Sequence, residues 1–103
     1  MKFKNLVFSR LDRISIGIEK DSGKYYLSIP VSNSTVDFEE YNELTKSEFD
    51  GFCLDISKAI PFAEDCRLRK LDHLLMQEPG IDRGTSIWDN HSNGNNLGIA
   101  EKQ

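Results

Sequence analysis

The sequence predicts an α+β fold, in which a small antiparallel sheet of about three to five strands from the N-terminal half packs against two C-terminal helices. Three observations support this prediction. The chain has 103 residues, enough for one hydrophobic core but not for two. Apolar and polar residues alternate over residues 14–18 and 25–31, as they do in half-buried strands. After residue 48, apolar residues recur at helical spacing instead.

The clearest predicted element is a β-hairpin. Residues 14–18 and 25–31 both alternate between apolar and polar or small side chains, and the polar segment 20–24 between them contains a glycine. This arrangement is typical of two strands joined by a tight turn. Pro30 has no backbone N–H to donate, so we expect it at an edge, a bulge or a strand end. Residues 3–8 are predicted to form an additional strand.

Residues 36–50 are strongly acidic, with six carboxylates against the single cation Lys46. Residues 36–43 are predicted to be a strand, because Val36 and Phe38 alternate with polar side chains. The strand would place four side chains on one face: Asp37, Glu39, Tyr41 and Glu43. Three carboxylates would repel one another in a core. That face therefore belongs to solvent or to a partner.

The adjacent pair Glu39 and Glu40 would point to opposite faces of this strand, so the two carboxylates are not expected to act as an acid–base couple on one substrate atom. We expect neither of them to be buried. A solvated charged edge and a partner-binding patch both fit the pattern, and Tyr41 favours binding because tyrosine adds contact area at low entropy cost. The predicted partner-binding residues are Asp37, Glu39, Glu40, Tyr41 and Glu43.

The segment 45–48, Thr-Lys-Ser-Glu, matches the capping box that begins a helix. An apolar stripe at helical spacing follows it. Pro61 would cost that helix a hydrogen bond, so we expect a break or kink within residues 55–61. A second helical piece is predicted to reach about residue 71, and residues 74–76 are predicted to form a short closing strand.

The net charge of −4 is unevenly distributed. Residues 1–35 carry +3, residues 36–65 carry −7, and residues 66–103 are balanced. A concentrated negative field speeds encounter with a cationic protein and repels nucleic acid. We therefore expect a basic protein partner and no direct contact with nucleic acid.

One domain is expected over residues 1–87, followed by an Asn- and Gly-rich flexible tail over residues 88–103 that has too little apolar surface to offset the entropy of ordering. The first apolar run is too short for a signal peptide, and no segment approaches the ~20 apolar residues of a membrane span. A cytoplasmic location is expected, where Cys53 and Cys66 would remain reduced.

Four potential metal ligands, Cys53, Cys66, His73 and His91, have separations of 13, 7 and 18 residues, which match no short metal-binding motif. A cysteine paired with His73 could in principle form a nucleophile, but no local signature supports one. Acidic neighbours should raise the pKa of Cys53. We therefore expect no metal, no cofactor and no enzymatic activity.

Two cationic features have structural explanations. The basic cluster at residues 66–70 is expected to complement a helix dipole; contact with the acidic strand or with a phosphate is the alternative. Segment 79–84 has the proline and glycines of a turn, and Arg83 within it is expected to be exposed; a functional role for Arg83 is the alternative.

Four segments together resemble small bacterial immunity proteins of contact-dependent growth inhibition and polymorphic toxin systems, the CdiI-type partners of CdiA C-terminal toxins. The segments are residues 25–33, residues 36–41, Cys66-Arg67-x-Arg69 and Pro79-Gly80-x-x-Arg83-Gly84. The resemblance spans residues 10–86. It implies a non-enzymatic inhibitor that binds one toxin domain, commonly a nuclease with a basic cleft, through an acidic surface.

Two other functions fit the sequence. One is an adaptor unrelated to toxins that binds its partners through an exposed sheet edge. The other is a small enzyme that uses His73, Asp72 or a cysteine.

Overall fold

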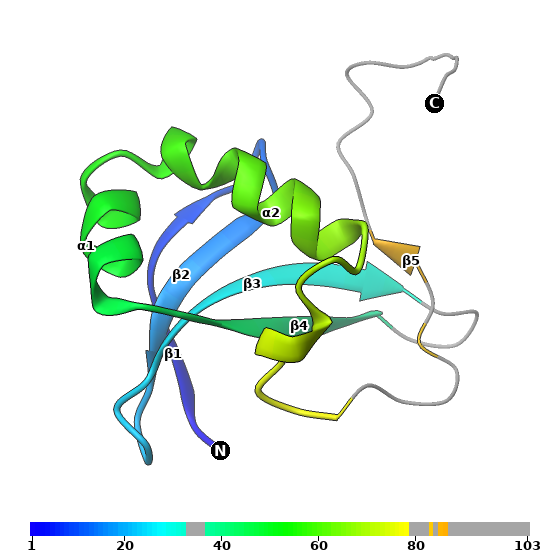
Figure 1. Cartoon of the computed structure of the whole chain (residues 1–103), viewed down its shortest axis with the longest axis horizontal. Coiled ribbons are helices and arrows are strands. Elements are labelled where there is room, and N and C mark those ends of the chain that lie inside the picture. The colour runs from blue at the N-terminus through cyan, green and yellow to red at the C-terminus, as the bar shows by residue number, and fades with distance from the viewer. Residues whose placement is uncertain (33–36, 79–82, 84, 87–103) are drawn as a thin grey trace.

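The computed structural model describes residues 1–32, 37–78, 83 and 85–86, and it confirms the predicted α+β fold. Four strands form an antiparallel sheet in the N-terminal half, in the order β1-β2-β3-β4, and a short β5 pairs with the end of β3 (Figure 1). The strands are β1 (Phe3–Ser9), β2 (Ile14–Glu19), β3 (Tyr25–Ser32), β4 (Asp37–Leu44) and β5 (Thr85–Ser86). The predicted tail at 88–103 lies outside the described residues.

The predicted hairpin is confirmed by β2 and β3, which pair from Ser15↔Ser28 to Ile18↔Tyr25. Pro30 lies inside β3, where it pairs with Glu39 of β4. On the other side of β3, pairing with β2 stops at Ser28 and pairing with β5 begins at Val31. Pro30 falls in the gap between them, where its missing N–H interrupts no ladder.

The helical half begins with α1 (Lys46–Leu54), and both bonds of the predicted capping box are present. The predicted break is also confirmed, because α1 is followed by a 3₁₀ turn, η1 (Ile56–Ala59), and then by α2 (Ile60–Arg67). Pro61 occupies the first turn of α2, where its missing N–H costs nothing.

Two sequence-based predictions in this half were wrong, one of a helix boundary and one of a strand. The second helix ends at Arg67 rather than near residue 71, and Arg69 just beyond it has the left-handed φ of 62° that commonly terminates a helix. The predicted closing strand is instead a 3₁₀ turn, η2 (Asp72–Leu74), followed by a single bridge from Leu75 to Asn42.

The main core lies between the sheet and the helical layer, which covers one face of the sheet in Figure 1. Alternate residues of β2 and β3 point into it, and they meet small buried residues of η1 and α2 that allow close approach. The buried core residues are Ile14, Ile16, Leu27, Ile29, Val31, Leu44, Ala59, Ala63 and Cys66.

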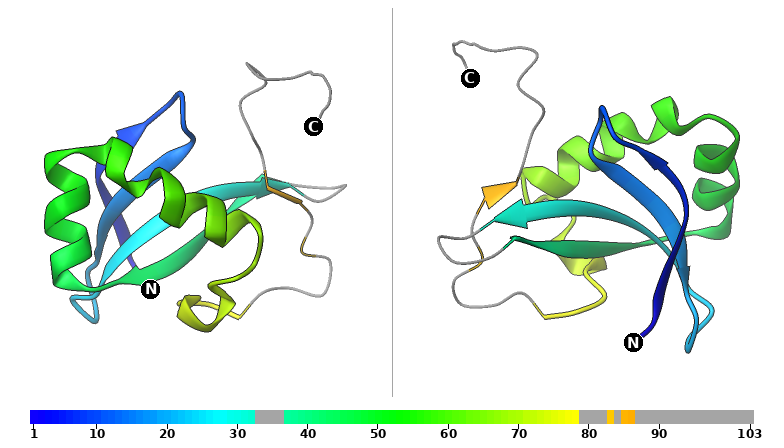
Figure 2. Two further views of the ribbon diagram at one scale, coloured as in Figure 1. Left: turned by 45° about the horizontal axis from the view of Figure 1, so that its top comes forward. Right: turned by 180° about the vertical axis from the view of Figure 1, so that it is seen from behind.

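The opposite face of the sheet, here called the outer face, has a small aromatic cluster of its own. Tyr26 is fully buried there and donates a hydrogen bond to the Asn5 side chain at 2.6 Å. Phe3 of β1 stacks on Tyr41 of β4 with ring centroids 3.6 Å apart, and both rings meet Tyr26 edge-on. Since β2 and β3 separate β1 from β4 in the sheet, this contact requires the sheet to curl, as Figure 2 shows.

Gly17 makes this curl feasible. It lies opposite Tyr26 in the β2–β3 register. A Cβ at position 17 would lie 2.1 Å from the Lys4 carbonyl oxygen and 2.6 Å from the Tyr26 hydroxyl. The absence of a side chain therefore leaves the space that the Tyr26 ring and the β1 backbone occupy.

Glu19 anchors the turn after β2. Its carboxylate is 1% exposed and accepts hydrogen bonds from the backbone N–H groups of Lys2, Asp21 and Ser22 and from the Ser22 hydroxyl. These donors, led by the Ser22 hydroxyl, lower the pKa of Glu19 to about 2. Glu19 therefore holds the hairpin turn against the start of β1 as a carboxylate.

No helix among the described residues is long and apolar enough to cross a membrane.

Two glycine substitutions should have opposite effects on stability. Gly17→Ala should lower the free energy of unfolding by about 2 kcal/mol or more, because β1 or the Tyr26 ring must move. Gly51→Ala should raise it by roughly 0.5–1 kcal/mol, because Gly51 lies within α1 with open space around it. Urea unfolding of the two variants measures both effects; equal stability of the two would show that Tyr26 does not pack on Gly17.

Candidate functional site

The acidic strand β4 alternates as predicted. Its side chains face the helical layer at even positions and the outer face at odd positions, so that Asp37, Glu39, Tyr41 and Glu43 share the outer face. Their cross-strand partners on β3 are Ser32, Pro30, Ser28 and Tyr26. None of these partners carries a positive charge. The alternation along β4 confirms the predicted common face. The facing positions on β3 supply no cation to its carboxylates.

Glu40 does not belong to this outward set. Its side chain faces the helical layer and is only 7% exposed, so the expectation that it is not buried was wrong. The reason is the strand alternation itself, which separates Glu40 from Glu39. Since Glu40 is enclosed by the fold, it is not available to a partner on the outer face, and it leaves the predicted binding set.

Arg83 neutralises the buried Glu40 carboxylate. Its guanidinium donates two hydrogen bonds to Glu40, at 2.5 and 2.7 Å, and two more to Asp72, at 2.7 and 2.8 Å. The Arg83 side chain is 10% exposed, which corrects the expectation that it would be exposed. These bonds lower the pKa of Asp72 and raise that of Arg83. We call these three residues the Arg83 clamp; it joins β4, η2 and the segment before β5.

Tyr41 is partly committed to the fold. One side of its ring is stacked on Phe3, and Tyr26 meets it edge-on. Partial burial raises the pKa of Tyr41, with a further contribution from the charge of Glu39, and burial raises the pKa of Tyr26 to about 12. Both phenols therefore remain protonated at neutral pH. Tyr41 offers a partner only the exposed remainder of its side chain.

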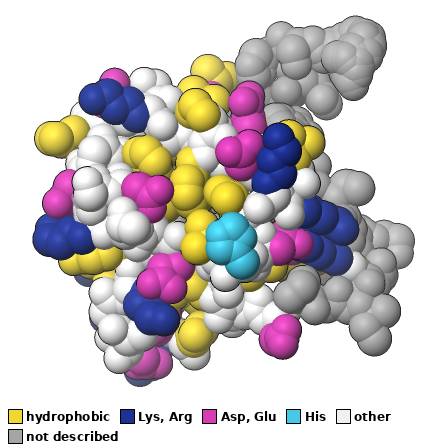
Figure 3. All heavy atoms as spheres, viewed as in Figure 1, with side chains coloured by type: hydrophobic (Ala, Val, Ile, Leu, Met, Phe, Trp, Pro, Cys, Tyr) yellow, Lys and Arg dark blue, Asp and Glu magenta, His cyan; other side chains and the backbone are white. Residues whose placement is uncertain are grey.

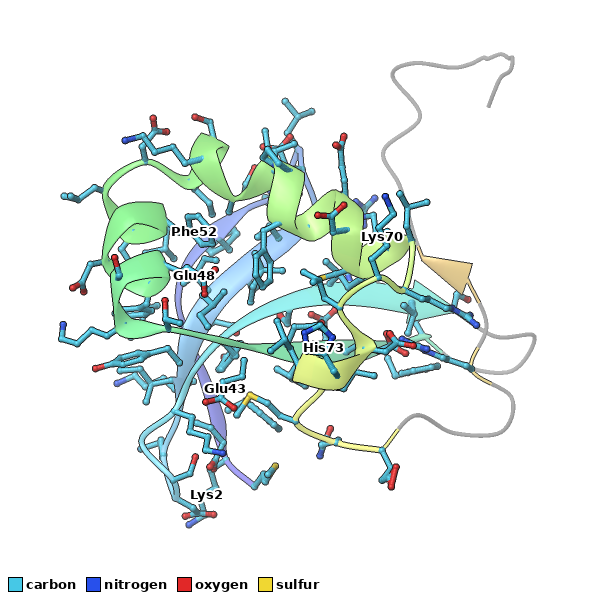
Figure 4. The ribbon with its side chains drawn as sticks, in the orientation of Figure 1. Lys2, Glu43, Glu48, Phe52, Lys70 and His73 are labelled. Carbon is cyan, nitrogen blue, oxygen red and sulfur yellow. The ribbon has the colours of Figure 1, made fainter. Side chains whose placement is uncertain are left out.

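Three carboxylates remain on the outer face. Asp37 and Glu39 are exposed, and Glu43 forms a 3.5 Å ion pair with Lys24 of the hairpin turn. Figure 4 shows Glu43 at the end of β4 nearest this hairpin. The ion pair is largely exposed and therefore weak, so Lys24 can yield to a cation from a partner. Partial burial raises the pKa of Glu39, so the fold disfavours its charged form.

The described residues on the helical side of the molecule carry charges of both signs. In Figure 3, acidic and basic side chains lie close together across this side. Glu48, which the sequence assigned to the capping box, accepts a hydrogen bond from the Thr45 backbone N–H. Lys46 and Asp50 pair along α1. These three charged residues serve α1 itself.

The alternative sites gain no support among the described residues. The described residues contain no cluster of three side chains that could hold a metal ion, and neither cysteine forms a disulfide. Burial raises the pKa of Cys66 to about 12. The pKa of Cys53 is raised as predicted, although burial contributes more than its acidic neighbour Asp50. Neither sulfur therefore has the thiolate character that a nucleophile needs.

The basic cluster at residues 66–70, where α2 ends, has a structural role. The Arg67 guanidinium donates to the Asp12 carbonyl at 2.5 Å and thereby ties the end of α2 to the β1–β2 turn. Arg67 also lies in the last turn of α2, where a cation complements the helix dipole as predicted. His73, labelled in Figure 4, lies exposed on η2.

Comparison with known proteins gave no relative: no family model, no curated protein and no solved structure matches this chain.

Removal of the Arg83 guanidinium tests the clamp. Arg83→Met should lower the free energy of unfolding by about 3 kcal/mol, because Glu40 would remain buried without a cation. Adding Glu40→Gln should recover part of that loss, since the neutral amide costs less to bury. Chemical denaturation of the single and double variants checks both expectations. An Arg83→Met protein as stable as the parent would mean that the clamp does not form.

Proposed function

We propose that this chain is a non-enzymatic immunity protein that binds and neutralises a cognate bacterial toxin domain. The observation that carries the proposal is the row of outward carboxylates Asp37, Glu39 and Glu43 on β4. The resemblance of the sequence to CdiI-type immunity proteins supports the toxin as the partner. The toxin class implied by that resemblance, a nuclease with a basic cleft, would supply the complementary charge.

The spacing of the row suggests how a partner would engage it. Alternate residues of a strand lie about 7 Å apart, so Asp37 and Glu39 are separated by one such step and Glu43 lies two steps further along. The exposed part of Tyr41 fills the intervening position. Lysines or arginines on an extended toxin segment, or along the wall of a cleft, could each meet one carboxylate.

The energetics suit a fast inhibitor. A row of one sign steers association with a cationic surface, and salt weakens that steering. Because the fold disfavours the ionised form of Glu39, a cation placed beside it would relieve an existing cost. Asp37 brings a solvent-exposed charge, which contributes mainly to the association rate.

A charge reversal of the row tests the proposal. The double variant Asp37→Lys/Glu39→Lys should bind the toxin encoded by the adjacent gene at least about tenfold more weakly at low salt, and it should no longer protect cells that express this toxin. Surface plasmon resonance over a range of salt concentrations measures the affinity, and colony survival measures protection.

The matched control is Glu64→Lys/Glu78→Lys, which makes the same change in net charge at two exposed positions outside β4. This control should retain both binding and protection. If the neighbouring toxin binds equally to all three proteins, the β4 row is not the interface. If it binds none of them and is not neutralised by the parent protein, the chain is not its immunity protein, and the adaptor function gains support.

A further inference from the structure

β1 forms an open edge of the sheet. Among the described residues it pairs with β2 alone, and β4 lies at the other end of the strand order. In the right-hand view of Figure 2, β1 (dark blue) lies at the margin of the sheet with β2 beside it. An edge strand presents backbone N–H and C=O groups to which another extended chain can bind.

The backbone N–H and C=O groups of Phe8 are directed toward this open edge. In β2, the Glu19 N–H donates to the Lys24 carbonyl on the β3 side, so alternate residues of β2, including Ser15, direct their backbone groups toward β3. Phe8 is the register partner of Ser15 and therefore forms a pair without hydrogen bonds to β2. Its own N–H and C=O face away from β2.

Apolar side chains and cations surround this part of the edge. Three large apolar side chains of β1 and the turn after it are exposed to solvent. They are Leu6 (46% exposed), Phe8 (62%) and Leu11 (64%). Leu6 is the extra residue of a β-bulge, which limits regular pairing to the stretch beyond it. The charged side chains of residues 1–13 are those of Lys2, Lys4, Arg10, Arg13 and Asp12. Asp12 accepts a hydrogen bond from the Ser9 hydroxyl at 2.8 Å.

A second copy of this chain does not fit the edge. Two β1 strands placed side by side would bring together two segments that each carry a net charge of +3 over residues 1–13, and this repulsion is unfavourable. The acidic strand β4 of another copy has its own edge occupied, because the Met76 N–H donates to the Tyr41 carbonyl and Leu75 bridges to Asn42. The charge of residues 1–13 instead favours a different chain that carries carboxylates.

We propose that β1 is a docking edge for an extended acidic segment of another protein, which adds as a strand beside Val7–Ser9. Its alternate side chains would be apolar, to cover Phe8 and Leu11, and acidic, to meet Lys4 and Arg10. This edge is separate from the outward carboxylates of β4, so the inference does not depend on the proposed immunity function. The molecule would have two interaction surfaces of opposite charge.

A synthetic peptide that alternates Glu and Val is the probe, and a peptide that alternates Lys and Val is its charge-reversed counterpart. In an NMR titration of the full chain, the Glu-Val peptide should shift amide resonances of residues 6–11, with the Phe8 N–H among the largest changes. The Lys-Val peptide should leave those resonances unchanged. Fluorescence anisotropy of the labelled Glu-Val peptide gives its affinity.

Lys4→Glu/Arg10→Glu should weaken binding of the Glu-Val peptide at least tenfold, and Phe8→Ser should weaken it by a smaller factor. The control Lys46→Glu/Lys70→Glu makes the same charge change at exposed positions outside β1 and should bind like the parent. Absence of binding at millimolar peptide, shifts confined to other elements, or equal binding by the two double variants would each overturn the proposal.

Discussion

The packing of Tyr26 against Gly17 is the constraint on which the arrangement of this protein depends. It brings the backbone of β1 close to a tyrosine ring of β3, and the sheet curls until Phe3 can stack on Tyr41. The sheet therefore buries part of both faces: one beneath the helices and one beneath the aromatic cluster. Among the described residues, the margins of the outer face remain open to solvent or a partner. The outward carboxylates of β4 and the open edge of β1 are two such margins.

The sequence predicted what depends on local periodicity. Alternation in β4 placed Glu39 and Glu43 on one face, and the capping box correctly began α1. Alternation also implied that Glu40 points the other way, but it could not supply the cation that makes burial tolerable. Arg83 lies 43 residues from Glu40 in the chain, in a segment whose glycines and proline indicated only a turn. Ion pairs between residues so far apart in the chain depend on tertiary packing, which the periodicity of a sequence does not indicate.

The same limit explains the reassignment of Tyr41. An aromatic residue among carboxylates resembles an interface anchor, yet its ring is stacked on Phe3, which the chain brings from the first strand. The carboxylates divide similarly. Glu19 and Glu40 are buried and fully engaged by donors, whereas Asp37 and Glu39 are exposed on the outer face. Buried carboxylates therefore hold the fold together, and we attribute the exposed pair to recognition.

The most direct test of that division is the stability of Glu39→Gln as a function of pH. The pKa of Glu39 is raised in the folded state above its usual 4.5, so the folded state holds this proton more tightly than the unfolded state does. Ionised Glu39 consequently opposes folding, and its cost develops as pH rises through 4.5 and the raised value. Chemical denaturation should find Glu39→Gln more stable than the parent at pH 7, with the difference vanishing below the usual carboxylate pKa. A variant less stable than the parent at pH 7 would show that the Glu39 carboxylate serves the fold and would contradict its assignment to a partner.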